Sequence, residues 1–273
     1  MNFLEAAKLV KNFTSVQKES YLFATAGTAD QIVMYLRAEA AKRGVDAVIS
    51  TLPFGTLDQF SFSKPSAEEE VVLLTSMDLV PAGDWRSGFP NATVDEAALL
   101  AQAEAVVGRV SSRPKANIFY LPAPLLPIFS DDLSQANFEM ELIRLVRTVG
   151  GSVLPAEMFS LGSYFATGAV IGGTQAGGVA EYIENFRAAT LPGSCKVLVT
   201  DLDNVMWSGV VAEDGADGVS AAPEGVGYVH YVYQGYLKTL MNRGVLVAAV
   251  SRNEAAIAVT PFQTGEMQLK ESD

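Results

Sequence analysis

The chain has 273 residues, and 49% of them are hydrophobic, which is enough for a large core in one or two domains. Its 19 basic and 31 acidic side chains give a net charge of −12, which disfavours nucleic acid and anionic membrane surfaces as partners. A single cysteine, Cys195, and a single histidine, His230, exclude an internal disulfide, a cysteine cluster for zinc and a histidine metal cage.

Membrane and export signals are not evident. No apolar run approaches the roughly 20 residues that span a bilayer. The first 18 residues carry Glu5, Lys8 and Lys11 among their apolar positions, unlike a signal peptide. We therefore expect a cytoplasmic protein.

Short apolar runs alternate with segments of helical periodicity along the first part of the chain. The expected strands are 21–25, 45–49, 71–74, 118–121 and, more weakly, 152–154. The expected helices are 29–43, 94–107, 133–149 and 179–189, with little periodicity between residues 155 and 178. Gly44 and Gly150 close two of these helices. This order predicts a mostly parallel sheet with helices on both faces.

A break at Leu191, Pro192 and Gly193 ends this pattern, and we place a domain boundary near residue 190. The alternation then restarts. The expected elements are a strand at 196–200, a flap at 205–225, a helix at 228–242, a strand at 245–250 and a helix from about residue 253. The sequence thus predicts two α/β domains, 1–190 and 191–273.

Two carboxylates close the apolar run CKVLVTDLD. Like charges at a strand end disfavour each other, so a cation beside Asp201 and Asp203 would explain the pair. Carboxyl ends of neighbouring parallel strands meet at one edge of a sheet, where Ser251, Arg252 and Asn253 follow the next strand. A hard cation such as Mg²⁺ binds carboxylate and phosphate oxygens, and a hydroxyl with helix-start amides binds the rest of a phosphate. The pattern indicates phosphoryl chemistry.

Longer motifs add a family resemblance. The stretch VLVTDLDNVMWSGVVAEDG, then APEG at 222–225 and RGVLVAAVSRNE at 243–254, resembles the haloacid dehalogenase (HAD) superfamily, specifically its FkbH-like subfamily IIIC. MDLVPAGDWRSGFP at 77–90 is similar to a stretch of the SGNH-like domain that precedes the HAD domain in that family. The resemblance implies an SGNH-like three-layer domain followed by a partial HAD-type, Rossmann-like parallel sheet domain.

The resemblance also implies an enzyme. In a Mg²⁺-dependent member, Asp201 would attack a phosphate to give an aspartyl phosphate, and Asp203 would act as general acid and then base. Both aspartates would be metal ligands. The implied phosphate-binding residues are Ser251, Arg252 and Asn253, and the implied substrate contacts are Asn204, Trp207 and Gly209.

Family members dephosphorylate a bisphosphoglycerate and pass a glyceryl unit to an acyl carrier protein in polyketide-type pathways, so these are the expected substrate and partner. Val250 stands where the family carries a cysteine for the acyl step, and Cys195 lies at the other end of its strand. The later lysine and acidic residue of the superfamily are not found, so we expect an incomplete HAD domain. Lys270, Glu271 and Asp273 are weak substitutes for them.

Other interpretations stay open. Asp201 and Asp203 could form a solvated strand end, Ser251 and Asn253 could cap the last helix, and the large area that an indole buries favours packing over ligand contact for Trp207. At the level of function, the alternatives are a noncatalytic module that docks a carrier protein or another partner, and a receiver-like phosphoacceptor with a long-lived phosphoaspartate.

The first domain lacks the residues of a serine hydrolase. Thr25, not serine, follows its first strand, and it contains no histidine. Asp78, Asp84, Trp85 and Arg86 cluster in a loop rich in proline and glycine, which indicates either a docking surface or an internal Asp84–Arg86 ion pair.

Overall fold

The computed structural model describes residues 1–27, 29–53, 55–66, 68–81, 84, 96–124, 133–190, 196–263 and 267–271. The chain divides into two compact units, Met1–Ala188 and Ala189–Asp273, close to the boundary that the sequence indicates. Within the described ranges, no helix is long and apolar enough to cross a membrane.

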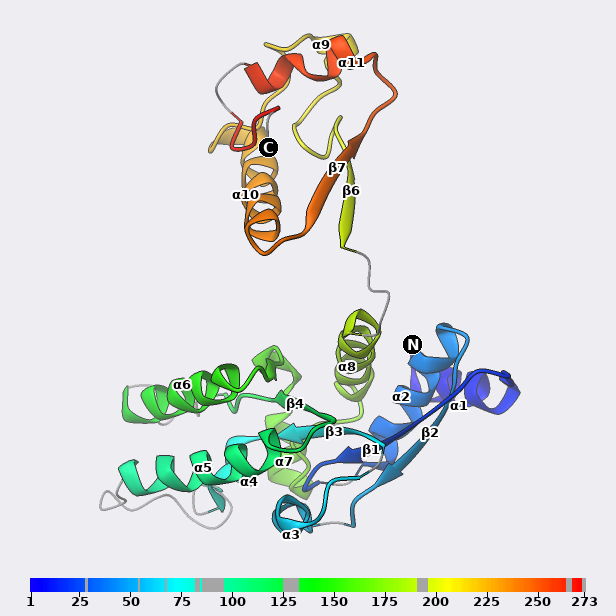
Figure 1. Cartoon of the computed structure of the whole chain (residues 1–273), viewed down its shortest axis with the longest axis vertical. Helices are drawn as coiled ribbons and strands as arrows, with labels where there is room; N and C mark the ends of the chain where they lie inside the picture. Colours follow the sequence, from blue (N-terminus) through cyan, green and yellow to red (C-terminus); the bar gives the residue numbers. More distant parts are fainter. Residues whose placement is uncertain are drawn as a thin grey trace. The chain divides into compact units, whose positions relative to one another are not determined.

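A five-stranded parallel sheet lies at the centre of the first unit, in the order β2-β1-β3-β4-β5 (Figure 1). Its strands are β1 (Lys18–Ala24), β2 (Asp46–Thr51), β3 (Glu69–Leu74), β4 (Ala116–Tyr120) and β5 (Ser152–Val153). The central strand β3 is buried from its second residue to its last, as expected for a parallel strand with both faces covered.

Helices cover both faces of this sheet. One face packs on α1 (Phe3–Asn12), α2 (Asp30–Lys42) and α8 (Ala176–Thr190), and the other on α3 (Leu57–Phe62), α5 (Glu96–Ser111) and α6 (Leu133–Thr148). Alternate residues of β3 separate the two cores, because Val71 and Leu73 face the first set of helices while Val72 and Leu74 face the second. The predicted α/β class, with a parallel sheet between two helical layers, is confirmed.

Four helices of the first unit, α1, α3, α4 (Ser76–Leu79) and α7 (Leu161–Thr167), are not among the helices predicted from sequence. Helix α1 has a capping box, in which Asn2 Oδ1 accepts from Glu5 N at 3.0 Å and Glu5 Oε2 accepts from Asn2 N at 2.9 Å. Helix α7 lies in the stretch that shows little periodicity, and it ends at Gly168 with φ +82°. Capping groups therefore mark the start of α1 and both ends of α7.

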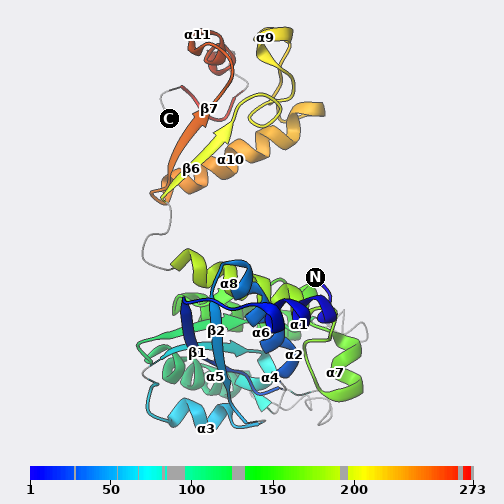
Figure 2. The same ribbon diagram turned by 90° about the vertical axis from the view of Figure 1, so that its right-hand side faces the viewer.

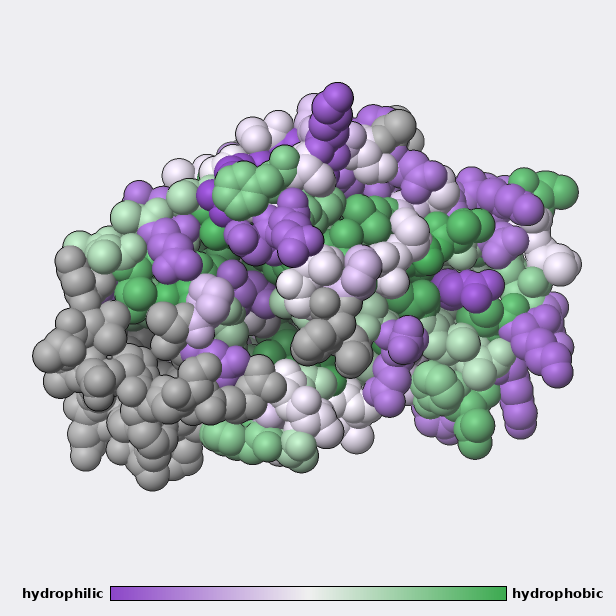
Figure 3. Space-filling view, turned by 90° about the horizontal axis from the view of Figure 1, so that it is seen from below, coloured by the Kyte–Doolittle hydropathy of each residue, from purple (hydrophilic) through white to green (hydrophobic). Residues whose placement is uncertain are grey.

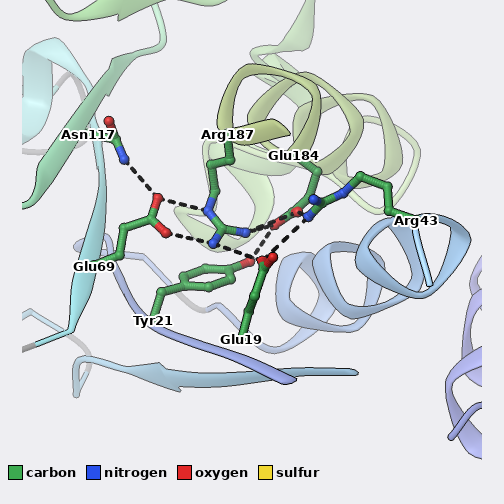
Figure 4. Close-up of polar contacts among 7 residues, drawn as sticks. All are labelled: Glu19, Tyr21, Arg43, Glu69, Asn117, Glu184 and Arg187. Carbon is green, nitrogen blue, oxygen red and sulfur yellow. Dashed lines mark hydrogen bonds and ion pairs between the residues drawn. The ribbon is translucent and has the colours of Figure 1, made fainter. Parts of the chain in front are cut away.

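A buried network of charged groups fastens α8 to the sheet (Figure 4). Arg187 donates from Nε and Nη2 to the two carboxylate oxygens of Glu69, at 2.9 and 2.7 Å, and from Nη1 to Glu184 at 2.8 Å. Its guanidinium stacks 3.9 Å from the ring centroid of Tyr21. Glu184 also accepts from Tyr21 Oη at 2.7 Å and from Arg43. The network therefore joins the last helix of this unit to β1, β3 and the end of α2.

The second unit is built on two parallel strands. β6 (Val197–Asp201) pairs with β7 (Leu246–Val250), so that Asp201 lies opposite Val250. Helix α10 (Tyr228–Asn242) lies along one face of this pair (Figure 2), where Leu198, Leu237 and Val247 belong to one hydrophobic core. Short helices α4 (Ser76–Leu79) in the first unit and α9 (Val211–Asp214) and α11 (Ala255–Ala258) in the second follow the strand ends.

Apolar side chains are exposed to different extents on the two units. On the face shown in Figure 3, the coloured polar and apolar residues are interspersed. The face of β6 and β7 that points away from α10 instead carries four exposed apolar side chains, Val197, Val199, Leu246 and Val250.

Candidate functional site

Asp203 is the centre of a hydrogen-bonded cluster beyond the carboxyl ends of β6 and β7. Its Oδ1 accepts from Trp207 Nε1 and from Val211 N, both at 3.1 Å. Its Oδ2 accepts from Asn253 Nδ2 at 2.7 Å. The carboxylate therefore links the loop after β6, the start of α9 and the loop after β7.

A tight loop positions Asp203. Asn204 has a left-handed backbone with φ +57°, and its N–H donates to Gly209 O at 3.1 Å. Gly209 N returns a hydrogen bond to Asn204 Oδ1 at 3.1 Å. Gly209 has φ +104°, and a Cβ there would lie 3.0 Å from Asp214 Oδ2. Asn204 and Gly209, which the resemblance assigns to substrate binding, close this loop.

Trp207 is fully buried, and its ring packs edge-on against Phe262 with centroids 5.5 Å apart. Burial favours the packing interpretation of this residue over substrate contact. The indole N–H is satisfied by Asp203, as buried tryptophans usually require.

Asp201 ends β6 and is exposed to solvent. Among the described residues, its carboxylate accepts one hydrogen bond, from Leu202 N to Oδ1 at 2.8 Å. Thr200 precedes it with a buried side chain, whose hydroxyl lies 3.0 Å from Tyr233 Oη on α10. The strand is thereby anchored one residue before the exposed carboxylate.

The three residues after β7 lie at the same edge as the two aspartates. Ser251 Oγ accepts from Asn253 N at 3.1 Å, which turns the chain so that the Asn253 side chain reaches Asp203. Arg252 is exposed. Glu254 occupies the N-cap position of α11 without a side-chain cap, so Ser251 and Asn253 do not cap this helix, contrary to the alternative interpretation.

Two residues of α10, to which the sequence assigns no role, hydrogen-bond to the loop that carries Asp203. Gln234 is fully buried; its Nε2 donates to Met206 O at 2.7 Å, and its Oε1 accepts from Gln268 N at 2.8 Å. His230 Nδ1 lies 2.8 Å from Val205 O. Gln234 lies among Tyr233, Leu237 and Met241, the residues of α10 that belong to the core, and a polar residue at such a position is the signal in the sequence that marks it.

The oxygen atoms of Asp201 and Asp203 fit a magnesium site only in part. Mg²⁺ is usually held by one or two carboxylates together with waters and phosphate oxygens. Asp201 offers an exposed carboxylate, but both oxygens of Asp203 already accept hydrogen bonds from N–H groups, so ligation by the Asp203 side chain is not supported. The described residues contain no cluster of three or more His, Cys, Asp or Glu side chains suited to a metal.

Lys270 and Glu271 are exposed, while Asp273 and Cys195 lie outside the described residues.

A second polar cluster lies in the first unit, at the carboxyl end of β3. Asp78 Oδ2 accepts from Thr75 N at 2.7 Å and from Thr75 Oγ1 at 2.8 Å, and Asp84 accepts from the buried Tyr164 Oη. Burial raises the pKa of Asp78 to about 6, and the charge of Asp84 adds to the rise, although the hydrogen bonds from Thr75 oppose it. Trp85 and Arg86 lie outside the described residues, so the docking surface stays a prediction.

Comparison with known proteins gives a likeness among solved structures. No family model matches the chain, and no curated protein sequence matches it. Among solved structures, the chain is similar to the N-terminal part of a protein from Bacteroides fragilis, a part that contains a phosphatase domain and was crystallised in complex with Mg. The TM-score is 0.79 at 18% sequence identity, over 99% of this chain and 79% of that one. At this identity the likeness establishes a shared fold.

Proposed function

We propose that the second unit is a Mg²⁺-dependent phosphatase of the HAD type, with Asp201 as nucleophile. The observation that carries the proposal is that Asp201 ends β6 while Asp203 and Asn253 lie just beyond the carboxyl ends of β6 and β7. The shared fold with a protein that contains a phosphatase domain complexed with Mg supports it, as does the resemblance of the motifs to the FkbH-like family.

The residues divide the chemistry between them. A carboxylate oxygen of Asp201 attacks phosphorus while the bond to the ester oxygen breaks, and Asp203 gives its proton to that leaving oxygen. Water then attacks the phosphorus of the aspartyl phosphate and gives a proton to Asp203. The bond from phosphorus to Asp201 breaks, and inorganic phosphate leaves.

The remaining groups hold the phosphate. Ser251 accepts a hydrogen bond from Asn253 N, which leaves its hydroxyl proton for a phosphate oxygen. Arg252 is exposed beside it and supplies a positive charge. A Mg²⁺ ion bound at Asp201 would offset the negative charge of carboxylate and phosphate.

The finer activity implied by the family is transfer of a glyceryl unit from a bisphosphoglycerate to an acyl carrier protein. Our proposal stops at phosphate release from a phosphorylated small molecule. Val250, at the end of β7, supplies no nucleophile for an acyl step.

Hydrolysis of p-nitrophenyl phosphate by the 273-residue chain tests the proposal. We expect nitrophenolate release that requires MgCl2, stops with EDTA and is abolished in Asp201→Asn. Asp217→Asn is the matched control, because Asp217 is an exposed acidic residue of the flap. Equal activity in Asp201→Asn and Asp217→Asn would exclude Asp201 as nucleophile.

One observation favours the noncatalytic alternative. The exposed apolar residues Val197, Val199, Leu246 and Val250 would suit contact with a partner protein. A docking module predicts that an acyl carrier protein binds equally well to Asp201→Asn and loses binding to Val199→Asp, with no phosphate release from the unaltered chain.

A further inference from the structure

We propose that Asn253 is a positioning residue for Asp203, and that it serves the oxygen through which Asp203 exchanges its proton. This inference rests on the proposed phosphatase function. It changes the role of Asn253 from the phosphate contact that the motif implies to a partner of the general acid.

The two oxygens of Asp203 have partners of different kinds. Oδ1 accepts from Trp207 Nε1 and from the backbone N–H of Val211, and both groups are donors only. Trp207 is fully buried against Phe262 and Val211 is a buried residue at the start of α9, so neither donor can turn away. A proton on Oδ1 would face two N–H groups, which makes Oδ1 a permanent acceptor.

Oδ2 faces a group that can either donate or accept. Asn253 donates from Nδ2 to Oδ2 at 2.7 Å while Asp203 is a carboxylate. A carboxamide carries an acceptor oxygen beside its NH2 group, so a half-turn about its terminal bond presents that oxygen to a protonated Oδ2. Asn253 therefore partners Oδ2 both before and after proton transfer. A lysine, an arginine or a backbone N–H in this place would favour the carboxylate alone.

The backbone turn after β7 holds the Asn253 side chain within hydrogen-bonding distance of Asp203 Oδ2. The hydrogen bond from Asn253 N to Ser251 Oγ, 3.1 Å long, fixes the turn after β7. The side chain is only partly buried, so its terminal amide can turn without disturbing a packed core. Asn253 thus joins the loop after β7 to the general acid after β6.

Leaving-group dependence separates a positioning role from phosphate binding. The general acid matters most for a poor leaving group, because such a group needs its proton in the transition state. We expect Asn253→Ala and the similarly sized, apolar Asn253→Leu to lower kcat for phenyl phosphate about 10-fold or more, and kcat for 2,4-dinitrophenyl phosphate much less. KM for both esters should stay within about twofold, since general acid–base assistance acts on the chemical step. Glu254→Gln, an exposed neighbour without a side-chain cap contact, is the control.

The outcomes are distinct. If Asn253→Ala raises KM for both esters and leaves kcat unchanged, Asn253 is a phosphate contact and the inference is wrong while the phosphatase stands. If the chain hydrolyses neither ester in an Asp201-dependent way, the proposed function itself fails and the inference falls with it.

A readout that does not require activity completes the test. In the ¹⁵N-labelled chain we expect Asp203→Ala to shift the carboxamide resonances of Asn253 together with the indole resonance of Trp207. Asn253 resonances that do not respond to Asp203→Ala would overturn the contact on which the inference rests.

Discussion

The carboxylates of Asp203 and Asp78 show how local surroundings set the use of the same side chain. Asp203 accepts three hydrogen bonds from donors on three separate segments, so its place is fixed for chemistry at an open edge. Asp78 accepts two hydrogen bonds from the neighbouring Thr75 and lies near the negative charge of Asp84. The surroundings of Asp203 suit a reacting group. Asp78 instead caps the short helix α4, and its burial makes the charged form of this carboxyl less stable.

This difference gives a prediction for Asp78. Burial raises its folded-state pKa to about 6 from an ordinary value of 3.8, so its favourable contribution is complete below about pH 4 and is lost as pH rises through 6. Asp78→Asn keeps an acceptor oxygen for Thr75 and carries no charge. We expect its free energy of unfolding to exceed that of the unaltered chain above pH 6, by on the order of 1–2 kcal/mol because the side chain keeps some solvent contact. The gain should vanish near pH 4.

Urea unfolding between pH 4 and pH 8 measures this difference, with Asp217→Asn as the exposed control. A gain from Asp78→Asn that is the same at every pH would contradict the assigned cause.

At the residue scale, the sequence predicts which residues meet at the edge of the sheet but not the hydrogen bonds between them. Asp201, Asp203 and Asn253 were expected at one sheet edge, because the carboxyl ends of parallel strands meet there. The bond between Asp203 and Asn253 could not be predicted, because it depends on the left-handed backbone at Asn204 and on the turn held by Ser251.

At the scale of elements, helix α8 depends on a charge network that apolar spacing does not reveal. The side chains of Arg187 and Glu184 are 3% and 2% exposed, and they are three residues apart on the helix. Their partners on β1 and β3 come from positions more than 100 residues earlier. These ion pairs therefore depend on the tertiary fold. The sequence predicts helix α8 but not the charged contacts that hold it on the sheet.

We expect Arg187→Met to lower the free energy of unfolding by about 2–4 kcal/mol, because the change removes the guanidinium that Glu184 and Glu69 share, although Arg43 still pairs with Glu184. Arg144→Met is the matched control: Arg144 also pairs with a glutamate three residues away, Glu141, but its side chain is 67% exposed. The control should change stability by about 0.5 kcal/mol or less. Similar losses in the two variants, measured by urea unfolding, would argue against a stabilising role of the buried network.

At the scale of the whole molecule, the alternation of strands and helices was sufficient to predict the α/β class. Every expected strand is present within a few residues of its predicted bounds, because each contains a short apolar run bounded by turn residues. Helices α1, α3, α4 and α7 are not predicted, and three of them have only four to seven residues, too few for a clear periodic pattern.

The two units also differ in how completely they bury their sheets. Helices cover both faces of the five-stranded sheet, whereas the β6–β7 pair leaves Val199 and Leu246 58% and 67% exposed on one face. The second unit nevertheless carries the residues that we assign to catalysis. The central claim is therefore that Asp201 of this unit becomes phosphorylated and is then hydrolysed.

Rapid quenching of the 273-residue chain with a phosphate ester and Mg²⁺, followed by mass spectrometry of its peptides, tests that claim most directly. We predict a transient gain of one phosphoryl group on the peptide that contains Asp201, formed and lost within each turnover and absent from Asp201→Asn. A phosphorylated Asp201 that persists without phosphate release would instead indicate a phosphoacceptor. Phosphate release without modification of that peptide would contradict the nucleophilic role of Asp201.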